Sequence, residues 1–361
     1  MSIEDLGTLG GVESGGNDIN AWGAVVGWSL DERGRRRAFI AKRGAAMRDL
    51  GGSATYLSVT ANAINYYGTV VGTVILPRSS GPMSAAALFP DDGTVTFLED
   101  RLRPIYRREE GCRFDSSASG ISDIGHIVGT AWLAGGPTSG GSCPSGRPPV
   151  LWLTPSTPTW VPGIDYHDEY GVALNNWDAV VGRHFEFFNS SARWSGGVTT
   201  VVPPPADPWL TEWEGSGWPS AISDRGYVAG VHYKQPGYRA RATLWDGRSQ
   251  TSVDLGLLTG GTESHATDVN EQTFVSGYGD TRYFLPATGA YVSSTFGFLY
   301  HEHFGKVLLP VLSPTGACTA SAVSNAITDG QSSAFLQMAG TCANHVGKKH
   351  AVRWSVWLDL R

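Results

Sequence analysis

Short apolar runs recur along the whole chain, each bounded by glycine or by a polar turn. A run begins with a small and an apolar residue, continues with Asn or Ser, and ends in a Val-Val-Gly-like segment. The clear copies are DINAWGAVVG (18–27), AINYYGTVVG (63–72), GISDIGHIVG (120–129), ALNNWDAVVG (173–182), AISDRGYVAG (221–230) and DVNEQTFVSG (268–277). A degenerate seventh copy is AVSNAITDGQSSAFLQM (322–338). The closing glycines are 45 to 57 residues apart, which is typical of one four-stranded β-propeller blade per copy.

Two further strands are expected in each copy. The third strand is an Ala-Phe-Leu-Trp variant, read as RAFIAK, AALF, PVLWL, ARW, ATLW, GFLY and AVRW. The fourth is seen as MRDLGG (47–52), SVDLGLLTGG (252–261) and VWLDL (356–360). The segment EDLGTLGG (4–11) resembles a fourth strand without its blade, so we expect it to pair with the last blade and close the ring. The pattern therefore predicts an all-β fold, with residues 1–361 forming a single seven-bladed β-propeller domain of four-stranded antiparallel blades.

The turn between the first two strands of a copy carries Asn-x-x-Gly or Ser-Asp-x-Gly, a composition typical of tight turns. Asp123 and Asp224 are accordingly interpreted as turn residues. A calcium site there is not favoured, because no dense Asp-x-Asp pattern surrounds them. We expect no cofactor.

The pattern DLGTLGG, A-x-x-IN-x-x-G-x-VVG and AFLW resembles the HAF-repeat family of bacterial, extracellular proteins. The resemblance covers the whole chain and implies a fold, but no shared chemistry and no catalytic residue. The chain departs from the His-Ala-Phe triplet of that family, with Arg-Ala-Phe at 37–39 and His-Ala-Val at 350–352.

Composition excludes several classes of partner. The formal net charge is −6, and only 17% of residues are charged, which argues against nucleic acid. The short basic cluster of Arg33 with Arg35, Arg36 and Arg37 is interpreted as solvated loop charge. No stretch of 18 apolar residues exists, so the sequence predicts no membrane span.

The four cysteines occupy matching places in the third and seventh copies. Cys112 and Cys318 precede the inner strand, whereas Cys143 and Cys342 are expected in the loop between the second and third strands. We therefore predict Cys112–Cys143 and Cys318–Cys342 disulfides, and with them an oxidising compartment. The chain opens MSIEDLGTLGG without a basic and apolar leader, so we expect a secreted or periplasmic protein whose signal peptide has been removed.

The repeat also serves as a ruler on which the copies can be compared. Five positions before the repeat Asn or Ser, four copies carry small residues, namely Gly15, Thr60, Ser117 and Thr319. Copies 4, 5 and 6 carry Tyr170, Trp218 and His265 instead. Two residues after the closing Gly, copies 4 and 5 have His184 and His232. This asymmetry predicts a functional sector at one mouth of the channel, formed by copies 4 to 6.

Aromatic, basic and carboxylate side chains together favour a sugar chain as ligand, because rings stack on pyranoses and charged groups fix hydroxyls and uronates. We predict a polysaccharide lyase that uses His184 or His232 as base, Tyr170 or Tyr233 as acid, and Arg183 to neutralise the uronate. The predicted substrate-binding residues are Trp218, His265, Glu169, Trp213, Arg282 and Tyr283.

Other interpretations stay open. A glycoside hydrolase needs two carboxylates, for which Asp168, Glu169, Glu212 and Glu214 are the candidates. A metal site would use His184, His232 and His265, but equivalent positions on neighbouring blades lie far apart. A lectin-like or adhesion propeller without chemistry would use the same aromatic mouth. Each of these residues could also be an ordinary loop residue that plugs the channel or packs on a neighbouring blade.

Overall fold

Alternating apolar and polar residues form β-strands throughout the part of the chain that the structure, a computed structural model, describes. The described ranges are 1–79, 81–98, 112–135, 149–164, 173–184, 190–206, 213–234, 239–285, 290–314, 316–325, 327–328 and 333–359. Side chains are not described at 112–114, 132–135, 184, 190, 213–216, 234, 283–285, 290–292 and 327–328. Within the described ranges every regular element is a strand, and no helix could span a membrane.

Four sheets each consist of four consecutive antiparallel strands. The first contains β10 (Cys112–Ile121), β11 (Ile127–Gly135), β12 (Pro149–Trp152) and β13 (Pro158–Trp160). The second contains β14 (Ala173–Leu174), β15 (Val180–His184), β16 (Ser190–Ser195) and β17 (Val198–Val201). The third contains β18 (Trp213–Ile222), β19 (Tyr227–Lys234), β20 (Arg239–Asp246) and β21 (Thr251–Asp254). The fourth contains β22 (Ser264–Val269), β23 (Val275–Leu285), β24 (Ala290–His301) and β25 (Gly305–Leu308).

An eight-stranded sheet precedes them in the chain and consists of two four-stranded antiparallel units. One unit contains β2 (Gly10–Ile19), β3 (Val25–Asp31), β4 (Arg36–Ala41) and β5 (Arg48–Asp49). The other contains β6 (Ser58–Ile64), β7 (Val70–Leu76), β8 (Met83–Phe89) and β9 (Thr96–Phe97). A single parallel bridge between Arg36 and Ser58 joins the two units.

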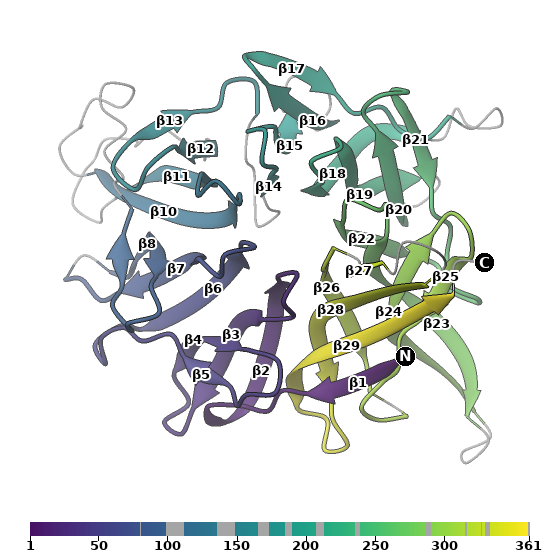
Figure 1. Ribbon diagram of the computed structural model, residues 1–361, viewed down its shortest axis with the longest axis horizontal. Coiled ribbons are helices and arrows are strands. Elements are labelled where there is room, and N and C mark those ends of the chain that lie inside the picture. Colours follow the sequence, from purple (N-terminus) through teal and green to yellow (C-terminus); the bar gives the residue numbers. More distant parts are fainter. Residues whose placement is uncertain are drawn as a thin grey trace.

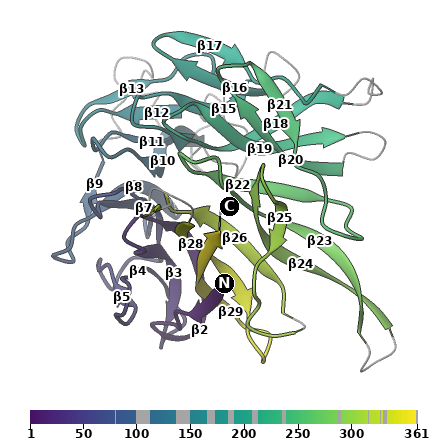
Figure 2. The same cartoon turned by 45° about the vertical axis from the view of Figure 1, so that its right-hand side comes forward.

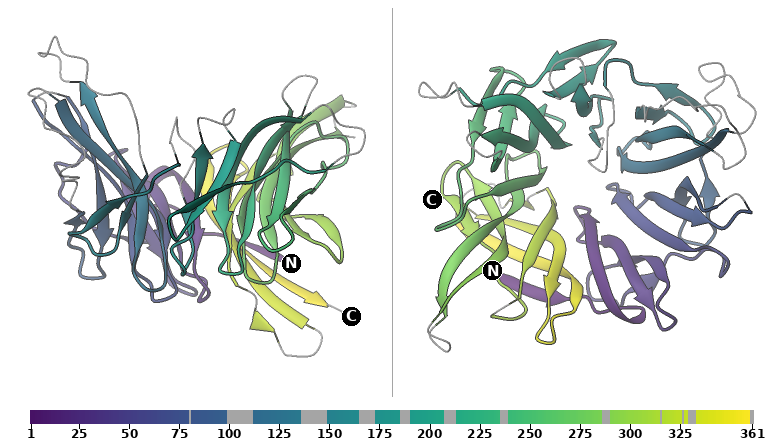
Figure 3. Two further views of the ribbon diagram at one scale, coloured as in Figure 1. Left: turned by 90° about the horizontal axis from the view of Figure 1, so that it is seen from above. Right: turned by 180° about the vertical axis from the view of Figure 1, so that it is seen from behind.

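The last sheet joins both ends of the chain. It contains β26 (Cys318–Val323), β27 (Ile327–Thr328), β28 (Ser333–Ala343), β29 (Lys349–Asp359) and β1 (Ser2–Asp5). The N-terminal β1 pairs antiparallel with β29, as Figures 1 and 3 show. The prediction that 356–360 forms a separate fourth strand is wrong, because β29 continues through Val356 to Asp359 and β1 takes the outer position.

The sheets lie side by side around a common centre, with the first strand of each nearest to it (Figure 1). Their cores form where neighbouring sheets pack face to face. One cluster joins Ala63 and Val71 to Trp152 of the next sheet, and another joins Phe39 to Ala339. The hairpin of β23 and β24 is the longest and extends outward from the body of the molecule (Figure 2). Because each sheet buries both faces, its strands depend on its two neighbours.

The repeat Asn joins neighbouring sheets in addition to closing its own turn. Asn175 Oδ1 accepts the N–H groups of Trp177 and Ala179, both at 3.0 Å. Its Nδ2 donates to the carbonyl oxygen of Ser223 in the next sheet at 3.0 Å. Bonds of this kind also run from Asn65 to Ser122 and from Asn270 to Ser324, and the bond from Asn20 to Asn65 joins the two units of the eight-stranded sheet.

The two aspartates interpreted as turn residues also reach across sheets. Asp123 Oδ1 accepts the N–H of Tyr66 at 2.8 Å, and Asp224 Oδ1 accepts that of Asn176 at 2.7 Å. In each case the acceptor belongs to the following sheet, so the bond runs back to the preceding one. Both aspartates lie in turns as predicted, and their carboxylates in addition bond to the preceding sheets.

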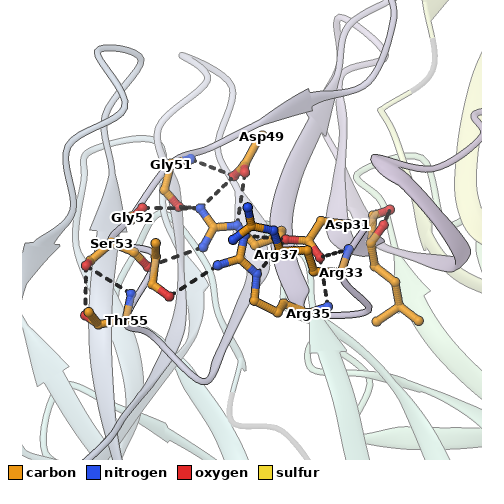
Figure 4. A network of polar contacts seen from close by, with 12 residues as sticks. Asp31, Arg33, Arg35, Arg37, Asp49, Gly51, Gly52, Ser53 and Thr55 are labelled. Atoms are coloured by element: carbon orange, nitrogen blue, oxygen red, sulfur yellow. Dashed lines mark hydrogen bonds and ion pairs between the residues drawn. The ribbon is translucent and has the colours of Figure 1, made fainter.

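A charged pair joins the third strand to the outer strand of several sheets. Arg37 Nε lies 3.0 Å from Asp49 Oδ2, and its Nη2 donates to the Gly51 carbonyl at 2.9 Å (Figure 4). Arg241 pairs with Asp254 at 2.7 Å, and His350 with Asp5 at 2.8 Å. The interpretation of Arg37 as solvated loop charge is wrong, because its side chain is buried and bonded to the outer strand.

The structure confirms the Cys318–Cys342 disulfide, with a Cα–Cα distance of 4.1 Å. The two residues are not in loops as expected, because Cys318 opens β26 and Cys342 lies opposite it in β28. Such close pairing is typical of directly opposed antiparallel residues. The predicted Cys112–Cys143 bond involves Cys143 and the Cys112 side chain, which lie outside the described residues.

The cross-sheet bonds of the repeat Asn predict a specific loss of stability. Asn175→Ala should lower the free energy of unfolding by about 2–4 kcal/mol, because it leaves buried partners in two sheets unbonded. Asn344 is the matched control: it accepts from Val346 and Lys348 in the β28–β29 turn, but the described structure gives it no bond to another sheet. Asn344→Ala should cost about 1 kcal/mol in urea unfolding. Equal losses would contradict the cross-sheet role.

Removing the disulfide gives a second prediction. Cys318 and Cys342 are 24 residues apart in sequence, so their bond restricts a moderate loop in the unfolded chain. Cys318→Ala with Cys342→Ala should lower stability by about 3 kcal/mol, measured by thermal unfolding without reductant. With excess reductant, the stability of the wild type should fall to that of the variant. Equal stability of the wild type and the variant without reductant would contradict the prediction.

Candidate functional site

The inner strands carry the large residues that the repeat comparison singles out. Trp218 lies in β18 opposite Val231, and His265 lies in β22 opposite Tyr278. The same place holds Gly15 and Thr60 in the two units of the eight-stranded sheet and Thr319 in the last sheet, each likewise on the innermost strand. The predicted difference between small and large residues is thus present on equivalent strands.

Three predicted residues from two sheets meet around Trp218. The guanidinium carbon of Arg183 in β15 lies 4.9 Å from the centre of the Trp218 ring. The Tyr233 ring in β19 stands edge-on to the same indole, with a centroid distance of 5.2 Å. A cation and an aromatic edge therefore hold the indole from two sides.

A small cavity opens on the side of Trp218 that faces the β22–β25 sheet. It has a volume of about 160 Å³ and is lined by Trp218, Val231, His265 and Tyr278, and by Ser220 and Thr267 of the same inner strands. The His265 and Tyr278 rings are stacked, with centroids 4.7 Å apart and planes 11° from parallel. Sequence comparison identified Trp218 and His265, but the two hydroxyl residues carry small side chains that no pattern marked.

His265, which lines this cavity, and the nearby Asp280 both have pKa values below their ordinary values. Burial lowers the pKa of His265 despite the opposing charges of Glu263 and Asp280, so its imidazole is neutral. Burial alone would raise the pKa of Asp280. The N–H groups of Thr262 and Glu263 and the Thr262 hydroxyl outweigh it and hold that pKa low. Asp280 is thus an ionised carboxylate that fixes the loop before β22.

His232 lies away from this cavity. It is 2% exposed, and its Nδ1 lies 3.0 Å from the Thr243 hydroxyl. A Cβ on Gly217 would lie 2.8 Å both from the His232 ring and from Ser191 of the preceding sheet, so the imidazole packs between two sheets. Burial lowers its pKa to about 4, against a backbone hydrogen bond at Val202 that raises it. The expectation of a base open to the channel mouth is corrected, because His232 faces the interior of a sheet interface.

The remaining predicted residues divide into two groups. Arg282 is exposed on β23. The rest lie outside the described residues, either entirely or in their side chains: Tyr170, Glu169, His184, Trp213 and Tyr283, and with them the hydrolase carboxylates Asp168, Glu212 and Glu214. His232 and His265 face opposite sides of the β18–β21 sheet, so the three-histidine metal site is not assembled. Within the described residues no group of three His, Cys, Asp or Glu could hold a metal ion.

A second feature occupies the opposite end of the inner strands, where they enclose a central cavity of about 180 Å³. Residues at or after the ends of β2, β6, β10, β14, β18, β22 and β26 all line it. Asp268 lines this cavity, and both Asp268 and Asp18, which directly precedes the lining residue Ile19, are partly exposed. Burial and the nearby Asp268 charge raise the pKa of Asp18 to about 7, against hydrogen bonds from Ile64 and Ile19. Burial likewise raises the pKa of Asp268 to about 6.

Comparison with known proteins shows the fold alone. No protein-family model matches the chain, and no curated protein is significantly similar in sequence. Oligogalacturonate lyase from Vibrio parahaemolyticus is similar in structure, with a TM-score of 0.52 and 9% identity over 97% of this chain and 92% of that one. The BP39L lectin from Burkholderia pseudomallei has a TM-score of 0.47 and 11% identity, over 97% and 99%. TolB from Acinetobacter baumannii has a TM-score of 0.45 and 11% identity, and the match covers 93% of this chain but 65% of TolB. The chain is thus an all-β protein of β-propeller type.

The raised pKa values of Asp18 and Asp268 predict a stability that falls as pH rises. Their folded pKa values lie above the ordinary 3.8, so the folded state holds the protons more tightly than the unfolded chain does. Stability should be greatest below about pH 4 for these groups and decrease as pH rises to about 7. Asp18→Asn with Asp268→Asn should remove this decrease in urea unfolding from pH 4.5 to 8. Asp280→Asn, whose carboxyl has a lowered pKa, should leave it in place; an unchanged slope in the double variant would refute the assignment.

Proposed function

We propose that the chain is one seven-bladed β-propeller domain spanning residues 1–361. The two units of the eight-stranded sheet count as two blades, and β1 completes the last blade beside β29. The central cavity, which every inner strand lines, supports a closed ring. Membership of the HAF-repeat family is part of this proposal. Pairing of Arg37, Arg241 and His350 with an outer-strand Asp gives a physical reason for a basic residue before Ala in that repeat.

We further propose that the mouth of blades 4 to 6 binds an acidic saccharide. The observation that carries this is the cavity between Trp218 and the stacked His265 and Tyr278, with Arg183 on the neighbouring blade. The flat rings offer apolar faces to a pyranose, and Ser220, which also lines the cavity, carries a hydroxyl group. Arg183 and Arg282 are the cations suited to a uronate carboxylate.

Cleavage of that saccharide by β-elimination is the second candidate. His265 is neutral and half-buried in the cavity, so it can take the C5 proton of a uronate. The electron pair left at C5 forms the C4–C5 double bond as the C4–oxygen bond breaks. A tyrosine, Tyr278 or Tyr233, supplies the proton to the leaving oxygen. The base role predicted for His232 passes to His265 because His232 is buried between sheets; His184 and Tyr170 remain candidates on sequence grounds.

We also propose a secreted or periplasmic location. The Cys318–Cys342 disulfide supports it, because structural disulfides persist in oxidising compartments and are rare in the cytosol.

Binding and cleavage are separated by one set of variants. Trp218→Ala should weaken binding of trigalacturonate by about tenfold or more in calorimetry, because a buried aromatic anchor dominates such a site. Thr60→Ala, at the equivalent place of another blade, is the matched control and should bind like wild type. Absorbance near 235 nm should rise with wild type and not with His265→Ala if the lyase proposal holds. Binding of trigalacturonate by the wild type without a rise in absorbance would indicate a lectin-like protein that does not cleave the saccharide. Wild-type affinity of Trp218→Ala would refute the proposed binding site.

A further inference from the structure

A row of large apolar side chains stands in solvent on the other face of the molecule. Two residues after the repeat Asn or Ser, the first four copies carry Trp22, Tyr67, Ile124 and Trp177, which are 63%, 76%, 59% and 74% exposed. The fifth and sixth copies carry Arg225 and Gln272 at the same place. The turn therefore also forms with polar residues, so folding does not explain the exposed apolar side chains.

A pocket of about 510 Å³ lies between the turns of the first two copies. Its aromatic wall consists of Trp22, Tyr66 and Tyr67. Trp22 Nε1 donates to the Tyr66 carbonyl at 3.1 Å, and the two rings are 5.2 Å apart at 53°. Tyr67 stands edge-on to Tyr66, with centroids 5.3 Å apart. The wall is thus held in place before any ligand binds, and the volume is that of a small-molecule site.

The rim of the pocket is positively charged. Lys42, Arg43 and Asp91 line it, and Arg48 pairs with Asp91 at 2.6 Å. Lys42 also lies 3.6 Å from the same carboxylate. Arg43 is exposed, and no carboxylate of the described residues pairs with it; its guanidinium carbon lies 5.5 Å from the Phe335 ring. Two cations and one carboxylate therefore line the pocket, and that carboxylate is paired with Lys42 and with Arg48, which leaves Arg43 suited to an anion.

We propose that this pocket is a second saccharide-binding site, which takes an acidic sugar. The rings of Trp22 and Tyr67 pack on the pyranose, and Arg43 binds its carboxylate. The site is independent of the Trp218 cavity, because it lies at the turn end of the inner strands and on different blades. The pocket is concave and of sugar size, whereas a protein partner would need a broad surface of roughly 800 Å².

The test uses the intact protein and trigalacturonate, with maltotriose as the neutral probe. Trp22→Ala with Tyr67→Ser should weaken trigalacturonate binding at one of two sites by about tenfold or more. Trp218→Ala should affect the other site only. Trp177→Ala is the matched control, with the same repeat position and similar exposure but outside the pocket, and should change affinity less than twofold. Arg43→Ala should bring trigalacturonate affinity down to that of maltotriose.

Each outcome decides the proposal. If the Trp22 and Tyr67 double variant keeps both sites at wild-type affinity, the proposal is wrong, whatever Trp218→Ala does. If wild type dimerises in sedimentation and the double variant is monomeric, without any saccharide effect, the row is a self-association surface and the proposal also fails. Thermal unfolding of each variant should match wild type, because the replaced rings are exposed; Tyr67→Ser alone serves if the double variant unfolds.

Discussion

Hydrogen bonds between the turn ends of neighbouring sheets are the constraint on which the rest of the structure depends. The repeat Asn holds its own turn through Oδ1 and the next sheet through Nδ2, so a single side chain fixes both the hairpin and its neighbour. At Ser122 and Ser223, which replace the Asn, the hydroxyl bonds within the turn, and the following Asp123 or Asp224 accepts an N–H group of the preceding sheet. Both solutions set the spacing of adjacent sheets at one end of the inner strands.

This arrangement explains why the two candidate sites lie where they do. Positions at the far end of the inner strands take no part in these bonds, so Gly, Thr, Trp and His all occur at one place of the repeat. The position two residues after the repeat Asn lies at the tip of the turn, where its N–H bonds to the Asn but its side chain is in solvent. At both places the backbone is fixed by neighbours while the residue type varies among the copies, which is the combination that a binding site requires.

The strands and the inner-strand sites were predictable from the sequence because they follow a repeating local pattern. The place of Trp218 and His265 on equivalent strands is of this kind. The burial of His232 was not predictable, because successive residues of a strand point to opposite faces of the sheet. The repeat pattern does not say which of these faces packs on a neighbouring sheet. Tyr233 lies beside Trp218, whereas its neighbour His232 is buried between sheets. Arg37 was misjudged for a related reason, because its partner Asp49 lies on the next strand.

The row of exposed apolar side chains on the turn face is found by the same comparison of copies. Trp22, Tyr67, Ile124 and Trp177 share one repeat position, and the change to Arg225 and Gln272 is visible in the sequence. A turn-tip residue would ordinarily be polar, so apolar side chains in four successive copies are as unusual as the large residues of the inner strands. What the sequence could not supply is the third dimension: that Trp22 bonds to the Tyr66 carbonyl and that Arg43 lies on the rim of the same pocket. In a repeat protein, comparison of copies locates the positions freed from folding, and only the contacts between copies show which of them act together.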